Sequence, residues 1–197
     1  RKKNILVEAE LGILSGKEDD ISIDEKFAKY TNPDEAQSFV NNTNCDSLAV
    51  AVGTSHGAYK FQGVEGIQFS ILKDIQRRLP NFPIVLHGGS AVNLDEIKRI
   101  NLSGGNLDNG TAGVPSDEIV KAINYGVCKI NIATDLRLLW ARVHREFFKN
   151  SPKLFDPVIP GKKYIEEFEK FMIKKFHLLG SSNKASKIIS NFKKNEK

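Results

Sequence analysis

Residues 84–90, Ile-Val-Leu-His-Gly-Gly-Ser, combine the two features that decide the fold. Three branched apolar residues are followed at once by a histidine, two glycines and a serine. A short apolar run of this kind is typical of a parallel strand buried on both faces, and the glycines indicate a tight loop after it. Chemistry in parallel α/β folds collects at the carboxyl ends of the strands, so the stretch predicts both a buried strand and part of a site.

The same pattern recurs in three other places. Residues 4–11, 47–52 and 127–132 are further apolar runs, and each precedes a segment rich in turn residues or glycine. Alternation of such strands with helices predicts the α/β class and a parallel sheet. A closed eight-stranded (β/α)8 barrel needs about twice this number of units. The expected helices span residues 33–41, 68–79, 95–102, 116–125, 136–150 and 164–179.

Length and charge place limits on the class of protein. The 197 residues suit one domain or part of a larger one, and the net charge of +5 comes from 29 basic and 24 acidic residues that are largely interspersed. We predict a partial barrel domain at residues 1–180 and a polar basic tail at 181–197. The tail is interpreted as solvated surface, so we expect neither a nucleic-acid nor a membrane partner.

Two further observations concern location. No apolar stretch approaches the roughly 18 residues that span a bilayer. Cys45 and Cys128 lie far apart without CxxC spacing, which favours buried free thiols in a reducing compartment. We therefore expect a cytoplasmic protein.

Two histidines fall at equivalent points of successive βα units. His56 follows the second apolar run and His87 follows the third, and each is flanked by glycine. Neighbouring strands would bring the two imidazoles within a few ångströms of each other, which suits a zinc site. A lone histidine at a strand end is more often an ordinary hydrogen-bonded loop residue, but the pair together favours a metal site.

The loops that carry these histidines also contain donors for an anion. A glycine directly after each histidine lets backbone N–H groups approach a phosphate closely, and Ser90, Thr134 and Lys60 add hydroxyl and ammonium groups. A glycine pair alone usually marks a turn. Donor-bearing loops at the ends of adjacent strands are a stronger indication of a phosphate cradle.

Five segments, in order, resemble the signatures of class II fructose-bisphosphate and tagatose-bisphosphate aldolases. They are VEAELG at 7–12, GKEDD at 16–20, GTSHGAYK at 53–60, VLHGGS at 85–90 and KINIATDLR at 129–137. The resemblance implies a lyase of carbohydrate metabolism that cleaves fructose 1,6-bisphosphate to dihydroxyacetone phosphate and glyceraldehyde 3-phosphate, a step of glycolysis. It also implies Zn²⁺, with a monovalent cation as a further candidate ligand, and a homodimer or tetramer.

The resemblance assigns the metal and catalytic residues as follows. His56 and His87 would be two of three ligands of the catalytic zinc, and Glu10 would sit at a second metal site. Glu18 would assist proton transfer, and Asn131 would contact the enediolate. Zinc then stabilises the charge left by carbon–carbon cleavage as a Lewis acid, so a Schiff-base lysine is not required.

The resemblance also assigns the substrate-binding residues. Arg137 would reach the distal phosphate of the ketose bisphosphate, and Ala133 would lie beside the substrate hydroxyls. The residues that would hold the phosphate of dihydroxyacetone phosphate are Gly57, Lys60, Gly88, Gly89, Ser90 and Thr134.

Two departures from the family pattern qualify these assignments. The Asp-His pair that supplies the base and the third zinc ligand belongs to an earlier strand, so the resemblance implies that this chain holds about strands 5 to 8 of a TIM (β/α)8 barrel with C-terminal helices. We therefore expect about four βα units to be missing from this chain and two sheet edges to be open. Many fructose-bisphosphate enzymes carry aspartate where Ala133 stands, which leaves a tagatose-bisphosphate aldolase as an alternative. A catalytically inactive fragment that binds sugar phosphates is another.

Overall fold

The computed structural model describes residues 5–14, 16–18, 21–23, 29–55, 66–108 and 113–195, with the backbone alone at 16–18, 21–23 and 192–195. Its strands are β1 (Glu8–Leu11), β2 (Gly16–Glu18), β3 (Ile21–Ile23), β4 (Ser47–Val50), β5 (Ile84–Leu86) and β6 (Val127–Ile130). Its helices are α1 (Pro33–Thr43), α2 (Phe69–Arg78), α3 (Leu94–Leu102), α4 (Ser116–Ile123), α5 (Thr134–Asn150), α6 (Val158–Leu178) and α7 (Ala185–Asn195).

Four strands form one parallel sheet in the order β1-β4-β5-β6. The four strands therefore stand in the sheet in the same order as in the chain, as in one half of a (β/α)8 barrel. The predicted fold class is confirmed. Within the described part of the chain, β1 and β6 each pair with one strand of this sheet. The two edges predicted to be open are thus formed by these outer strands.

An ion pair shows that the sheet is curved. Lys129 on β6 places Nζ 2.9 Å from both carboxylate oxygens of Glu8 on β1. In a flat sheet, three strand spacings would separate these outer strands by about 14 Å. The side chains meet because both edges bend toward one face, which corresponds to the inside of a barrel.

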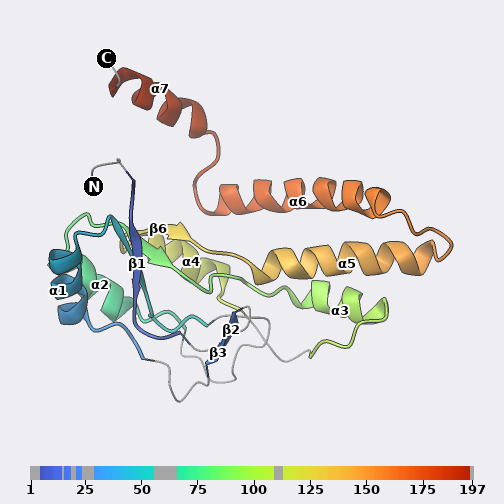
Figure 1. Ribbon diagram of the computed structural model, residues 1–197, viewed down its shortest axis with the longest axis horizontal. Coiled ribbons are helices and arrows are strands. Elements are labelled where there is room, and N and C mark those ends of the chain that lie inside the picture. The colour runs from blue at the N-terminus through green and yellow to red at the C-terminus, as the bar shows by residue number, and fades with distance from the viewer. Residues whose placement is uncertain are drawn as a thin grey trace.

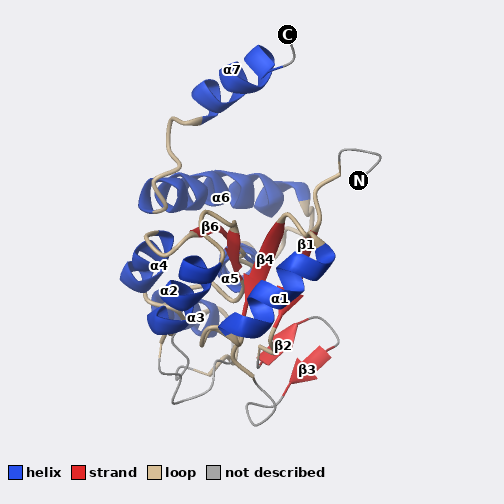
Figure 2. Ribbon diagram, turned by 90° about the vertical axis from the view of Figure 1, so that its left-hand side faces the viewer, coloured by secondary structure: helices blue, strands red, loops and turns tan. Residues whose placement is uncertain are grey.

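The main apolar core lies on the opposite face of the sheet, under α1, α2 and α4 (Figure 2). Side chains alternate along each strand, so Leu48 and Val50 of β4 and Ile84 and Leu86 of β5 all enter this core and are fully buried. Burying a side chain of this kind contributes about 1.5–3 kcal/mol. The core therefore holds the strands in place and leaves the other face free for polar residues.

A second group of helices extends beyond the sheet. Helices α3, α5 and α6 run side by side in Figure 1, and a small cluster of Val92, Ile97, Ile100 and Leu138 joins α3 to α5. Helix α6 covers α5 but leaves most of its own surface exposed, and α7 projects away from the body in both views (Figures 1 and 2). No helix of the described residues is long and apolar enough to cross a membrane.

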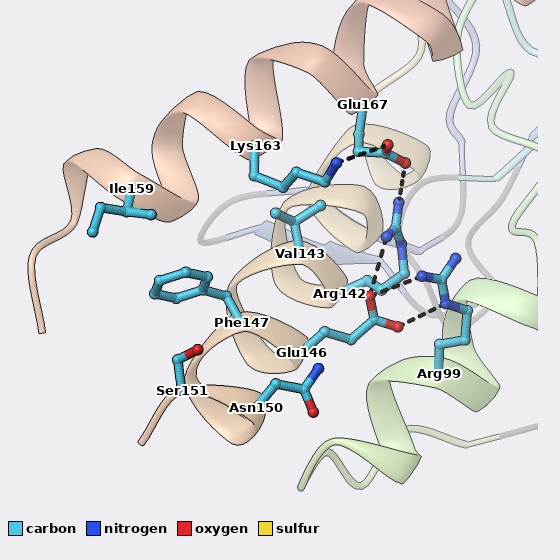
Figure 3. Close-up of a pocket in the computed structure, with 10 residues that line it drawn as sticks. All are labelled: Arg99, Arg142, Val143, Glu146, Phe147, Asn150, Ser151, Ile159, Lys163 and Glu167. Atoms are coloured by element: carbon cyan, nitrogen blue, oxygen red, sulfur yellow. Dashed lines mark hydrogen bonds and ion pairs between the residues drawn. The ribbon is translucent and has the colours of Figure 1, made fainter. Parts of the chain in front are cut away.

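Arg142 of α5 joins these three helices through charge (Figure 3). Its guanidinium donates to Glu96 of α3 at 2.6 Å, to Glu146 of α5 at 3.3 Å and to Glu167 of α6 at 3.1 Å. The side chain is only 5% exposed. Burial alone would lower the pKa of Arg142, but the hydrogen bonds from its guanidinium to these carboxylates outweigh that effect and raise it.

The carboxylates of this network predict how stability depends on pH. Burial raises the pKa of Glu146, but hydrogen bonds from Arg99 and Arg142 bring it below its ordinary value of 4.5. A hydrogen bond from Lys170 has the largest effect on Glu167 and lowers its pKa. Burial acts in the opposite direction, but a second hydrogen bond, from Arg142, lowers the pKa further. A pKa that is lower in the folded state gives stability that is complete above the unfolded value and is lost as pH falls through the folded one.

We therefore expect the free energy of unfolding to decrease as pH falls below about 4.5, in part through these two groups. Urea denaturation at a series of pH values measures the slope of the free energy of unfolding against pH. Glu146→Gln should flatten it, whereas Glu169→Gln, at an exposed position of α6, should leave it unchanged. Equal slopes for the two variants would contradict the prediction.

Several local predictions were wrong. Residues 16–20 were expected to be a loop, but Gly16–Glu18 and Ile21–Ile23 pair as an antiparallel hairpin. Cys45 is buried as predicted, whereas Cys128 is exposed because its strand lies at the sheet edge. Ser116 does not cap α4, because it is the first helical residue after Pro115. The polar composition of the tail gave no indication of α7.

Candidate functional site

The carboxyl ends of β1, β4, β5 and β6 converge on one rim of the curved sheet. Thr31 joins two of them: its hydroxyl donates to the carbonyl of Leu11 at 2.5 Å and accepts from the amide of Ala51 at 2.8 Å. Thr31 is buried and was not singled out from the sequence, where nothing distinguishes it from an ordinary loop threonine. It fixes the starting points of the loops that follow β1 and β4.

His87 and Glu10, two of the residues assigned to the predicted site, come together on this rim. The Nδ1 atom of His87 lies 3.2 Å from Oε1 of Glu10, within hydrogen-bonding distance, and the two side chains are 17% and 42% exposed. The other ring nitrogen, Nε2, is buried. A carboxylate on one imidazole nitrogen fixes the tautomer and orientation of the ring, which is the arrangement found behind histidine ligands of metals.

The loop after β4 lies against the loop that contains His87. A Cβ atom at Gly88, where φ is +65°, would lie 2.5 Å from the carbonyl oxygen of Ser55. The hydroxyls of Thr54 and Ser55 are buried and have no hydrogen-bond partner among the described residues. His56, Gly57 and Lys60 lie outside the described residues, as does the side chain of Glu18, so their predicted roles stay predictions.

The loop at residues 88–92, called the 88–92 loop below, packs against the segment that begins α5. The amide of Gly89 donates to the carbonyl of Asn131 at 3.1 Å, and a Cβ at Gly89 would lie 2.5 Å from Cγ2 of Ile130. Ser90 and Thr134 are both buried. The structure thus brings together Gly88, Gly89, Ser90 and Thr134, which were predicted to hold a phosphate.

The amide groups of this loop are largely engaged within the protein. Besides the Gly89 amide, those of Ala91 and Val92 donate to the carboxylate of Asp135 at 3.0 and 2.8 Å. A phosphate at this rim would therefore use the hydroxyl-bearing residues Ser90 and Thr134 more than these amides. Gly89 serves instead to let the loop approach β6 closely.

The remaining predicted residues lie on the α5 side of the rim. Asn131 directly follows β6, and Ala133 takes the N-cap position of α5 without a side-chain hydrogen bond. Asn131, Ala133 and Arg137 are all exposed. Their positions leave them accessible to a ligand that approaches the carboxyl end of β6.

Asp135 was missed by the sequence reasoning. It is buried in the first turn of α5, where its carboxylate binds two loop amides and lies 3.2 Å from Nζ of Lys175. The signal that could have found it is an acidic residue just inside a helix that follows a strand, because such a carboxylate is well placed to accept backbone N–H groups.

Two cavities are lined largely by helical residues, and the second also reaches Ala91 of the 88–92 loop. One of about 410 Å³ is lined by residues of α3, α5 and α6, including Arg142 and Phe147 (Figure 3), and one of about 350 Å³ lies beside it and is lined in part by Asp135 and Lys175. The charged groups of the first cavity are already paired with one another across the helices. We therefore place the candidate site at the strand ends rather than in this cavity.

The described residues do not by themselves form a metal site. They contain no group of three or more histidine, cysteine, aspartate or glutamate side chains placed to hold a metal ion. An imidazole that has a carboxylate at one ring nitrogen can bind Zn²⁺ through the other nitrogen. Further ligands would be needed to complete such a site. His56, two residues after Thr54 in the adjoining loop, is the candidate from this chain.

Comparison with known proteins gives a consistent result. Residues 1–106 and 108–184 match the family model described as fructose-bisphosphate aldolase class-II. A fructose-bisphosphate aldolase of Thermus caldophilus is 42% identical over 179 residues, which cover 89% of this chain and 58% of that protein. One of Treponema pallidum is 39% identical over 202 residues, which cover 94% and 59%.

A solved structure agrees in fold. The crystal structure of the YdjI aldolase from Escherichia coli K12 superposes with a TM-score of 0.60 at 27% sequence identity, over 92% of this chain and 51% of that one. The chain thus spans somewhat more than half the length of the curated relatives that it matches.

Proposed function

The chain belongs to the class II fructose-bisphosphate aldolase family, and we propose that it supplies the zinc-binding and phosphate-binding half of an enzyme that cleaves fructose 1,6-bisphosphate. The products would be dihydroxyacetone phosphate and glyceraldehyde 3-phosphate. The observation that carries this proposal is the contact of His87, which follows β5, with Glu10 of β1, across the intervening strand β4 and beside the 88–92 loop. The reaction is a step of glycolysis, and the setting we propose is the cytoplasm.

The metal part of the proposal rests on the donor set. His87 and His56 would bind Zn²⁺, and Glu10 would orient His87 or hold a second metal ion. Zinc, when bound, would supply Lewis-acid stabilisation of the negative charge that develops on the substrate oxygens as the carbon–carbon bond breaks. A monovalent cation is a further candidate ligand that nothing among the described side chains singles out.

The chain's own residues would bind and orient the substrate. Ser90 and Thr134 are buried beside the start of α5, where the N-terminus of a 17-residue helix favours an anion. Lys60 and Gly57 would complete the cradle, and Arg137, exposed one turn into α5, would bind the distal phosphate. Asn131 would contact the carbons that react, and Glu18 would move a proton.

The choice of ketose depends on residue 133. Ala133 presents no acceptor at the N-cap of α5, so the site offers one polar partner fewer for distinguishing epimers at the substrate hydroxyls. We favour fructose 1,6-bisphosphate because the relatives that are about 40% identical carry that name. Tagatose 1,6-bisphosphate is the second candidate.

The experiment uses the natural protein purified from cells. Its intact mass, zinc content and oligomeric state are measured first, and cleavage of fructose and tagatose 1,6-bisphosphate is then followed in a coupled assay before and after chelation. We expect a chain heavier than 22.0 kDa, a homodimer or tetramer, about one catalytic zinc ion per chain and turnover of the fructose substrate that a chelator abolishes.

Other outcomes would identify the alternatives. Faster turnover of the tagatose substrate would reassign the ketose. Binding of dihydroxyacetone phosphate without turnover of either ketose would indicate an inactive sugar-phosphate-binding protein. Turnover that survives complete removal of zinc would overturn the class of mechanism.

A further inference from the structure

We propose that Asp135 and Lys175 form a positioning pair that sets both the conformation and the local charge of the 88–92 loop. The inference deepens the proposed function and rests on it, because the loop matters as part of the phosphate site. Neither residue is expected to touch the substrate. They act through Ser90 and its neighbours, and they connect the loop to α6, which lies behind α5.

Asp135 fixes the backbone of the loop. Its Oδ2 accepts from the amide of Ala91 at 3.0 Å, and its Oδ1 accepts from the amide of Val92 at 2.8 Å. Its own amide lies 3.4 Å from the hydroxyl oxygen of Ser90. The side chain is 5% exposed, so these bonds form where water does not compete with them.

The loop needs such support because Val92 has an unfavourable backbone conformation. Its φ is +52°, in the left-handed region that branched residues rarely adopt. Its side chain is 2% exposed and packs with Ile97, Ile100 and Leu138. Only a carboxylate can accept both amides at once, because an asparagine in the same position would turn an NH₂ group toward one of them.

Lys175 compensates the charge of Asp135. Its Nζ lies 3.2 Å from Oδ2, and the lysine side chain is 15% exposed and lies over the ring of Phe171. A buried carboxylate next to Ser90 would repel a phosphate if it were not neutralised. The ammonium group from the last turn of α6 removes that repulsion while it holds the carboxylate in place.

The first test measures the loop directly by amide hydrogen exchange in the natural protein. In Asp135→Asn, the amides of Ala91 and Val92 should exchange at least about tenfold faster relative to that of Ile97. Asp117→Asn is the matched control, because Asp117 is likewise the second residue of a helix but is exposed. Unchanged relative exchange in Asp135→Asn would overturn the positioning role.

The second test measures binding of dihydroxyacetone phosphate by calorimetry. Lys175→Gln should weaken binding about tenfold with the zinc content unchanged, and Lys175→Arg should restore it to within about threefold. Lys162→Gln, at an exposed position of the same helix, is the control. Equal affinity for Lys175→Gln and the parent would overturn the charge-compensating role.

The two tests separate this inference from the proposed function. A parent protein that does not bind dihydroxyacetone phosphate would refute the phosphate site and with it the charge-compensating role, while hydrogen exchange still decides whether Asp135 holds the loop. If Asp135→Asn does not fold, both measurements on Lys175→Gln decide instead. Faster relative exchange at Ala91 and Val92 would support the pair, and parent-like exchange would overturn it.

Discussion

His87→Ala is expected to remove the catalytic zinc from the natural protein and to reduce cleavage of fructose 1,6-bisphosphate by more than about a thousandfold. The imidazole is one of the proposed zinc ligands, and a bound zinc ion would contribute several kcal/mol to stabilising the charge that develops in the proposed reaction. His87 is held by Glu10 at 3.2 Å and is largely buried, so another side chain of this rim cannot easily replace it. Metal analysis and the coupled assay measure both effects.

The controls for His87→Ala use two other residues. His177→Ala removes an exposed histidine from α6 and should leave zinc content and turnover unchanged. Lys60→Ala should keep the zinc and mainly raise the KM for the bisphosphate, because Lys60 is proposed to contact a phosphate and not to bind the zinc ion. Unchanged zinc content in His87→Ala would remove this residue from the metal site.

The strands and most helices were predicted well from the sequence. A continuous apolar run indicates a strand that is buried on both faces, and apolar residues at helical spacing indicate a helix that is buried on one face. Residues 84–86 and 127–130 were both found as parallel strands, and the α/β half barrel followed from their alternation with helices. Boundaries were less accurate. Helix α6 begins at Val158 rather than near Tyr164, because the segment around Pro157 and Pro160 suggested a turn although proline is tolerated in a first helical turn.

The sequence pointed to the carboxyl ends of the strands as the place of the candidate site, because chemistry-bearing residues follow the strands directly. The contact of His87 with Glu10 was not predicted, because Glu10 lies on β1 and His87 follows β5, with β4 between them. Asp135 and Thr31 could not be found in this way, because their importance lies in contacts to backbone groups of segments 20 to 44 residues away. No local pattern records which amide a buried carboxylate or hydroxyl will meet.

Gly88 illustrates how fold and site depend on each other, and Gly88→Ala is expected to be strongly destabilising. The position has φ of +65°, where an alanine costs about 1–2 kcal/mol relative to glycine. The added Cβ would also meet the backbone of Ser55 at 2.5 to 3.1 Å, and backbone atoms cannot swing aside as a flexible side chain can. The loops after β4 and β5 would therefore have to separate.

Gly180→Ala isolates the effect of that contact. Gly180 has the same φ of +65°, but a Cβ there would meet nothing within 4 Å. Both variants share the conformational cost and the change in the unfolded chain, so the difference between their free energies of unfolding reports the clash with Ser55. We expect Gly88→Ala to be less stable than Gly180→Ala by at least about 2 kcal/mol in chemical denaturation, and to lose zinc affinity as well. Equal losses for the two variants would mean that Ser55 does not lie against Gly88, and the proposal that His56 and His87 bind one zinc ion would lose this support.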